Sequence, residues 1–74
     1  MMNNIVDALK VSEVTIKYKS LLSGNLKEVR GTLLPPHFVP QNPHNDAVVM
    51  WDVENERWED IRVDTIISWI RTSV

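Results

Sequence analysis

The sequence predicts a small, mainly β domain with five strands and a short N-terminal helix. Two apolar-rich runs, residues 47–51 and 58–63, flank a polar connection at residues 53–56, and their β-branched and aromatic residues are typical of a β-hairpin. A third apolar run, residues 66–70, follows after only Asp64 and Thr65. That connection is too short to cross over to a parallel neighbour, so the chain must turn sharply and continue locally.

The totals indicate one globular domain over residues 1–74. A hydrophobic content of 43% and a charged content of 24% are ordinary for a folded chain of 74 residues. The absence of cysteine excludes disulfides and thiolate metal sites. We find no secretory signal and no apolar run near the roughly 20 residues of a membrane span. We therefore expect a cytoplasmic protein, in the host cytoplasm if viral, with no membrane partner.

Residues 3–10 favour a helix, with Ile5, Ala8 and Leu9 on one face and Asn3 or Asn4 as its N-cap.

The first strands are predicted from their periodicity. Residues 12–20 alternate as a strand that points Val14, Ile16 and Tyr18 toward the core. The next strand, residues 26–34, follows a turn in which Gly24 and Asn25 can take positive φ. It contains Gly31, where we expect a bend that lets one strand serve both halves of a barrel.

The segment from Pro35 to Asp46 is predicted to be an irregular loop. It holds all four prolines and both histidines of the chain, and proline cannot lie in the middle of a sheet. Its length suggests a functional role, with Phe38 and Val39 tucked under the barrel as an anchor.

The last elements complete the predicted barrel. If Asn55 takes the left-handed conformation, the hairpin turn is a three-residue loop with a bulge. Asp64 and Thr65 form a tight, 3₁₀-like corner, and the final strand, residues 66–72, places Ile67 and Trp69 on one face. This order of elements favours an SH3-like or Sm-like small barrel. A five-stranded OB barrel is the nearest alternative, but it would have a helix between its third and fourth strands.

The hairpin region resembles a family of short SH3-fold proteins of tailed bacteriophages that is related to the WYL-type barrel. The resemblance covers roughly residues 14–70 and depends on the strings Val48-Val49-Met50-Trp51-Asp52, Ile61-Arg62-Val63-Asp64-Thr65-Ile66-Ile67 and Val29-Arg30-Gly31-Thr32-Leu33, with Trp58 between the first two. It implies the barrel fold and a phage origin. It carries over no activity, and the Trp-Tyr-Leu tripeptide of the ligand-sensing WYL site does not occur in this chain.

Nothing in the sequence indicates an enzyme or a cofactor. A hydrolase needs a nucleophile, a base and an orienting group brought together, and no serine lies in a nucleophile motif. His37 and His44, with Asp46 or Asp52, could in principle bind a metal, but their spacing is unspecific. The carboxylates around the hairpin tip favour a solvated turn over an acid/base pair or a cation site, namely Glu54, Glu56, Glu59 and Asp60. We therefore expect no catalytic residue, metal or cofactor.

The tryptophans indicate a possible function more clearly than the titratable residues do. Trp58 shares its strand parity with Asp60 and Arg62, which predicts an outward position, either in a cross-strand pair with Met50 or Trp51 or free to contact a partner. We expect a host or phage protein to bind the following residues: Trp58, Glu54, Glu56, Asp60, Arg62, His37 and Phe38.

Nucleic-acid binding is the alternative function. It would use basic side chains that we expect to align on the outer face of the first hairpin, namely Lys17, Lys19, Lys27 and Arg30. The net charge of −2 gives it no general electrostatic support. Self-association through open strand edges, as in Sm-like rings, is compatible with either function.

Overall fold

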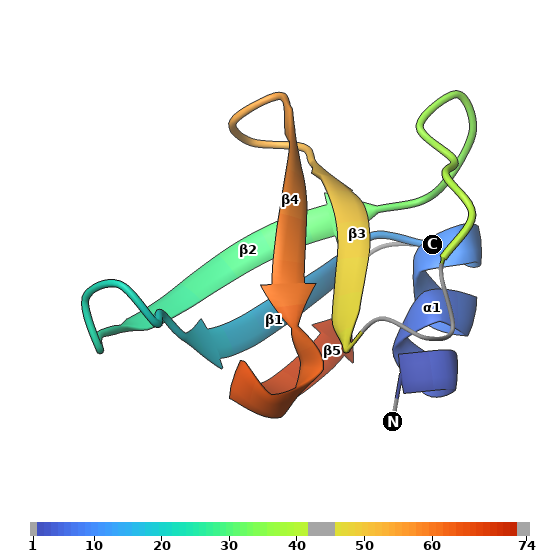
Figure 1. Ribbon diagram of the computed structural model, residues 1–74. Helices are drawn as coiled ribbons and strands as arrows, with labels where there is room; N and C mark the ends of the chain where they lie inside the picture. The colour runs from blue at the N-terminus through green and yellow to red at the C-terminus, as the bar shows by residue number, and fades with distance from the viewer. Residues whose placement is uncertain (1, 42–45, 73–74) are drawn as a thin grey trace.

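One antiparallel sheet with the strand order β4-β3-β2-β1-β5 forms the body of the molecule. The computed structural model describes residues 2–41 and 46–72. Its elements are α1 (Met2–Val11), β1 (Val14–Lys19), β2 (Leu26–Thr32), β3 (Ala47–Asp52), β4 (Arg57–Arg62), η1 (Val63–Thr65) and β5 (Ile66–Arg71). Figure 1 shows that the long β1–β2 hairpin extends away from the β3–β4 hairpin, with α1 at the opposite end. The predicted mainly β fold with five antiparallel strands is confirmed.

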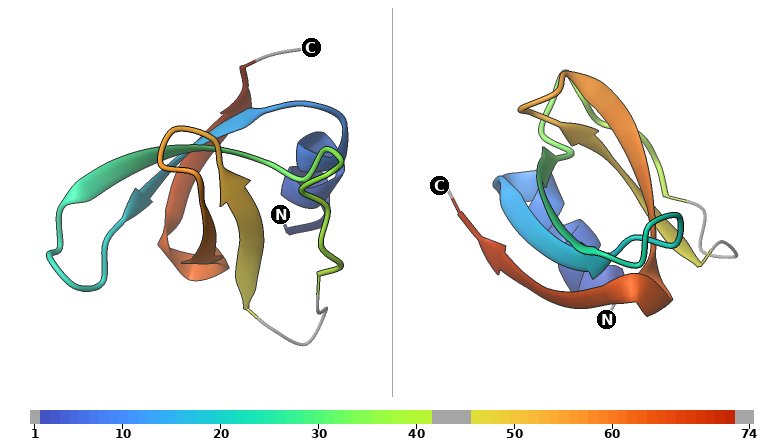
Figure 2. Two further views of the ribbon diagram at one scale, coloured as in Figure 1. Left: turned by 90° about the horizontal axis from the view of Figure 1, so that it is seen from above. Right: turned by 90° about the vertical axis from the view of Figure 1, so that its left-hand side faces the viewer.

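The sheet curves strongly and encloses the core between its inner face and α1 (Figure 2). The apolar residues that alternate along the strands point inward, and α1 contributes Ile5 and Leu9, both completely buried. The predicted apolar face of the helix is confirmed. The predicted N-cap is wrong, because the helix begins at Met2 and both asparagines lie within it. A helix of this length is unstable alone, so its position against β1, β2 and β3 depends on this packing.

Buried hydroxyls attach the end of α1 to the sheet. The Leu33 amide donates to the Leu9 carbonyl at 2.9 Å, and the Ser12 hydroxyl donates to the Ala8 carbonyl at 2.9 Å. The Thr32 hydroxyl oxygen accepts from the Leu34 amide at 3.0 Å and lies within 3.4 Å of the Leu9 carbonyl. These bonds satisfy carbonyls that the helix end would otherwise leave unpaired in the interior.

Gly31 joins the two hairpins. It pairs with Val14 of β1 on one side and with Asp52 of β3 on the other. A Cβ atom placed on Gly31 would approach Cγ of Met50 to 2.8 Å, and Met50 is completely buried. Only glycine leaves room for this side chain where the two halves of the sheet meet, which confirms the expectation that this strand serves both halves.

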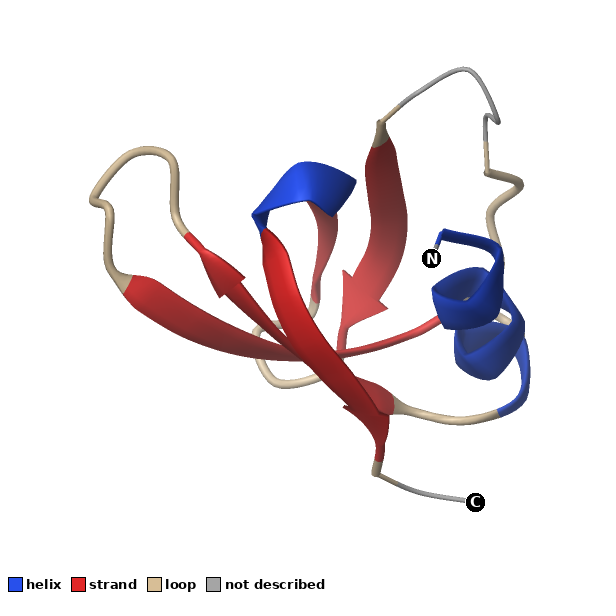
Figure 3. Cartoon of the chain, turned by 90° about the horizontal axis from the view of Figure 1, so that it is seen from below, coloured by secondary structure: helices blue, strands red, loops and turns tan. Residues whose placement is uncertain are grey.

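The corner and the last strand agree with the prediction only in part. The 3₁₀ corner occurs at η1, between β4 and β5 (Figure 3). The predicted faces of β5 are wrong, because Tyr18 pairs with Ile66 while Lys17 pairs with Ser68, which leaves Ile67 as an extra residue. This bulge turns Ile66 and Trp69 toward the same core and leaves Ile67 exposed.

The hairpin turn also differs from the expectation. Asp52 pairs with Arg57, so four residues rather than three form the turn, and the residue with positive φ is Glu56, at 53°, rather than Asn55. In the first turn Gly24 has a φ of 74°, as expected. Phe38 is 49% exposed and does not anchor the loop, whereas Val39 packs against the core.

Gly31→Ala is expected to destabilise the fold by about 1–3 kcal/mol, because the added methyl group overpacks the core against Met50. Chemical denaturation followed by tryptophan fluorescence measures this change. In a Met50→Ala background the same substitution should be less destabilising, since the colliding atoms are absent. Equal losses in both backgrounds would show that the Gly31–Met50 contact is not the constraint.

Candidate functional site

Three aromatic rings gather on the outer face of the β3–β4 hairpin. Trp51 and Trp58 are directly opposite each other on the two strands, with ring centroids 5.4 Å apart and planes at 78°. His37, from the loop after β2, stacks on Trp51 at 4.3 Å with an interplanar angle of 8°. Its centroid lies 6.4 Å from that of Trp58. We call these three residues the aromatic cluster.

The centroid distances place Trp58 beside the stacked pair. If Trp58 covered the free face of Trp51, its separation from His37 would approach the sum of the other two distances, which it does not. Trp58 is therefore supported by two rings and still 46% exposed. The predicted cross-strand pair with Trp51 is confirmed, and the ring remains accessible. A large, rigid and exposed aromatic ring is the typical anchor of a protein interface.

Gln41 fixes the loop that carries His37. Its side-chain nitrogen donates to the Val49 carbonyl at 2.8 Å, and its side-chain oxygen accepts from the Val49 amide at 3.0 Å. β2 pairs with β3 only at Gly31 and Thr32, so this part of the β3 backbone lies beyond the pairing with β2. The Gln41 side-chain amide makes the hydrogen bonds that a neighbouring strand would otherwise make there. These bonds hold the loop beside the aromatic cluster.

Asp52 shapes the turn next to the cluster. One carboxylate oxygen accepts from the backbone amides of Glu54 and Asn55 at 3.0 and 3.1 Å, and the other accepts from the Asn55 side chain at 2.9 Å. Burial by itself would raise the pKa of Asp52, but these bonds and the nearby Arg57 outweigh it and hold the pKa below its usual value. A turn ordered in this way sets the start of β4 and therefore the position of Trp58.

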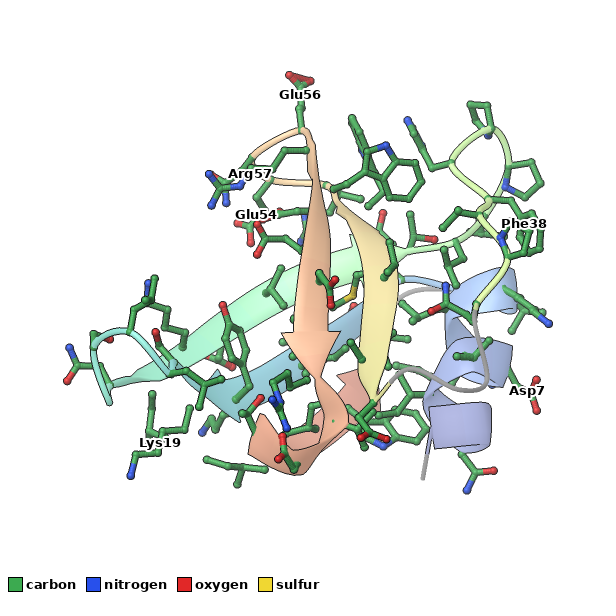
Figure 4. All side chains as sticks on the ribbon, in the orientation of Figure 1. Asp7, Lys19, Phe38, Glu54, Glu56 and Arg57 are labelled. Carbon is green, nitrogen blue, oxygen red and sulfur yellow. The ribbon has the colours of Figure 1, made fainter. Side chains whose placement is uncertain are left out.

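The polar residues predicted for partner binding are divided between two sides of the hairpin. Asp60 shares the outer face with Trp58, and Glu56 projects beyond the turn (Figure 4). Glu54 points to the side away from the loop, and Phe38 points away from the hairpin on the far side of the loop (Figure 4). The structure thus brings His37 and Trp58 together, with Asp60 on the same face of β4 but lining a groove with Lys19 and Leu22, and with Glu56 at the turn. Glu54 and Phe38 lie apart from the aromatic cluster.

The cations of this hairpin are neutralised by neighbouring carboxylates. Arg57 forms an ion pair with Glu59 at 3.0 Å, and Arg62 makes two bonds to Asp64, at 3.2 and 3.1 Å. The surface formed by the aromatic cluster with Glu56 and Asp60, which we call the Trp58 surface, therefore has an excess of negative charge. Arg62, predicted as a binding residue, is occupied within its own chain.

The basic residues proposed for nucleic acid are less well aligned than expected. Arg30 is paired with Glu13 at 3.2 Å, and Lys17 lies directly opposite Glu28. Lys27 pairs with Tyr18, so it has the parity of the inner face, and the predicted alignment of all four cations is wrong. Lys17, Lys19 and Arg30 remain on one face.

The predicted histidine pair lies only partly within the described residues. His37 is engaged in the aromatic cluster, and His44 lies outside the described residues. In the ranges 2–41 and 46–72 no three histidine or carboxylate side chains come together as metal ligands. No helix among these residues is long and apolar enough to cross a bilayer.

Comparison of the chain with protein-family models, curated proteins and solved structures finds no match.

The aromatic cluster could be predicted from the sequence only in part. Strand parity predicted that Trp58 faces outward, and the hairpin pattern allowed Trp51 opposite it. No local pattern indicated that His37 would stack on Trp51 or that Gln41 would bind the β3 backbone, because both contacts join a loop to a strand distant in sequence.

Gln41→Ala is expected to release the loop and to lower stability by about 1 kcal/mol, since two hydrogen bonds to the backbone are lost. Amide hydrogen exchange at Val49 should accelerate, and NMR measures it directly. Gln41→Glu is the matched control, because its carboxylate can still accept from the Val49 amide but cannot donate to the carbonyl. Exchange at Val49 that is unchanged in Gln41→Ala would contradict this role.

The depressed pKa of Asp52 predicts an acid-sensitive fold. The ionised form is favoured in the folded state, so its stabilisation is complete above the unfolded pKa of about 3.9 and is lost as the pH falls through the lower folded value. Thermal unfolding of the wild type and Asp52→Asn from pH 7 downward measures the effect. The wild type should be more stable at neutral pH, and the difference should shrink below about pH 4. A constant difference would contradict the assignment.

Proposed function

We propose that this chain is a non-enzymatic interaction module that binds another protein through the Trp58 surface. The observation that carries the proposal is the state of Trp58, which is held by two aromatic neighbours and still leaves almost half of its area exposed. Binding then requires little ordering of this side chain, which favours affinity. The unpaired carboxylates at the rim favour a partner with basic groups.

The finer fold class belongs to this proposal. A sheet in which β1 lies between β2 and β5, an N-terminal helix and a 3₁₀ corner before the last strand support an SH3-like or Sm-like barrel. The resemblance in the hairpin strings supports a phage accessory protein whose partner is a host or viral protein in the cytoplasm. Self-association through the edge strands β4 and β5 is compatible with this function.

Nucleic-acid binding through Lys17, Lys19, Lys27 and Arg30 is the weaker alternative. The ion pair of Arg30 and the separate face of Lys27 reduce the continuous positive surface that a phosphate backbone requires. Binding of this kind would weaken steeply with salt, and a gel-shift series with single-stranded RNA and DNA would detect it.

Capture of proteins from host lysate tests the main proposal. Trp58→Ala should reduce recovery of a specific partner about tenfold or more, as expected for an interface anchor. Glu56→Lys should reduce it through charge repulsion, and quantitative mass spectrometry of the eluates measures both. Phe38→Ala is the matched control, because this ring is similarly exposed but points away from the hairpin. Identical partner profiles for wild type and Trp58→Ala would refute the proposal.

A further inference from the structure

The turn between β1 and β2 exposes a second apolar surface. Leu21 is 72% exposed and Leu22 is completely exposed, at the end of the hairpin that reaches farthest from α1 (Figure 1). A pair of adjacent, uncovered leucines is unusual on a monomer and indicates a contact surface. Lys19 and Lys27 flank the turn, and the sequence between Val14 and Lys27 contains no carboxylate. We call these four residues the basic tip.

The basic tip is complementary in charge to Glu56, and both surfaces expose apolar side chains. Leu21 and Leu22 lie beside lysines at the tip, where Asp60 and Asp64 line the grooves around Lys19, and the exposed ring of Trp58 lies on the hairpin that carries Glu56 at its turn. The tip's lysines have no ion pair among the described residues, and neither has Glu56. An ammonium group placed over the Trp58 ring would gain a cation–π contact as well as the attraction of Glu56.

The basic tip adjoins Asp60 of its own molecule but cannot reach Glu56. The β1–β2 turn lies at one side of the fold, whereas Glu56 lies at the far end of the β3–β4 hairpin, and Phe38 marks the loop beyond it (Figures 1 and 4). Asp60 borders a groove beside Lys19 and Leu22 of its own chain, so Glu56 is the carboxylate that a second molecule would meet first. Any contact between the basic tip and Glu56 must therefore join different molecules.

We infer that the partner of the Trp58 surface is a second copy of this chain, which inserts its basic tip. Leu21 and Leu22 of one molecule pack on the aromatic cluster of the next, and Lys19 or Lys27 faces Glu56. This inference rests on the proposed function, since it uses the same surface and identifies its occupant. The contact is head-to-tail, so repetition yields a ring or an open filament.

Sedimentation velocity of the purified chain over a concentration series tests the inference. The wild type should assemble as concentration rises and dissociate in about 1 M salt, where the Debye length is about 3 Å. Leu22→Ser and Glu56→Lys should each weaken assembly about tenfold or more. Both positions are exposed at turns, so neither substitution should disturb folding, which circular dichroism verifies. Ile70→Ser is the matched control, because Ile70 is 65% exposed on the edge strand β5.

Mixing the two defective variants provides the decisive measurement. Leu22→Ser keeps an intact Trp58 surface, and Glu56→Lys keeps an intact basic tip, so together they can form only one productive contact. The mixture should give a one-to-one complex and nothing larger. A wild type that stays monomeric at every concentration would overturn the inference. Assembly that survives Leu22→Ser but is lost in Ile70→Ser would also overturn it, in favour of edge-strand pairing.

These outcomes are distinguishable from those of the proposed function. If the wild type is monomeric but loses a lysate partner in Trp58→Ala, the second copy is excluded and the binding surface stands. If the wild type assembles and the variants behave as expected, but no other protein depends on Trp58, self-assembly is the role of the surface. If Trp58→Ala and Glu56→Lys change neither measurement, both proposals fail.

Discussion

The close approach of Met50 to Gly31 is the constraint on which the rest of the structure depends. Gly31 is the position at which β2 pairs with both of its neighbours, so the β1–β2 and β3–β4 hairpins are joined through it. Met50 occupies the space that a larger residue would fill. Because the sheet is continuous at this point, it can curve around one core, and α1 can close that core from one end.

The same junction positions the aromatic cluster. Thr32 pairs with Trp51 directly after Gly31, which sets the register of β3, and Trp51 in turn lies opposite Trp58. The buried carboxylate of Asp52 then orders the turn between the two strands. The packing of the interior thus fixes the positions of the aromatic rings on the outer face. A rigid ring can contribute to binding without a large loss of entropy.

Charge is distributed unevenly over this frame. Around the β3–β4 hairpin the arginines are paired within the chain, while Glu56 extends freely. Around the β1–β2 turn the lysines lie beside exposed leucines. The net charge of −2 does not show that these lysines and Glu56 lie at different ends of the molecule. Local charge, rather than the total, determines which partner can approach each surface.

The sequence by itself determined the features that depend on neighbours along the chain. Alternation of apolar residues predicted the strands and their inner faces, and the parity of Trp58 with Asp60 predicted its outward position. A two-residue connection predicted the corner before β5, and an isolated glycine inside a strand predicted that both halves of the sheet would meet at Gly31. Each of these conclusions requires only a window of a few residues.

Only the tertiary structure decided the features that depend on contacts between distant segments. The bulge at Ile67 arises from pairing with β1, and the opposite faces of Lys17 and Lys27 depend on the register of the first hairpin. His37 stacks on Trp51, and the Gln41 side chain hydrogen-bonds to the Val49 backbone, so both contacts join the proline-rich loop to β3. Such contacts join segments that are distant in the chain and follow no periodicity in the sequence, which is why the strands were predictable and the aromatic cluster was predictable only in part.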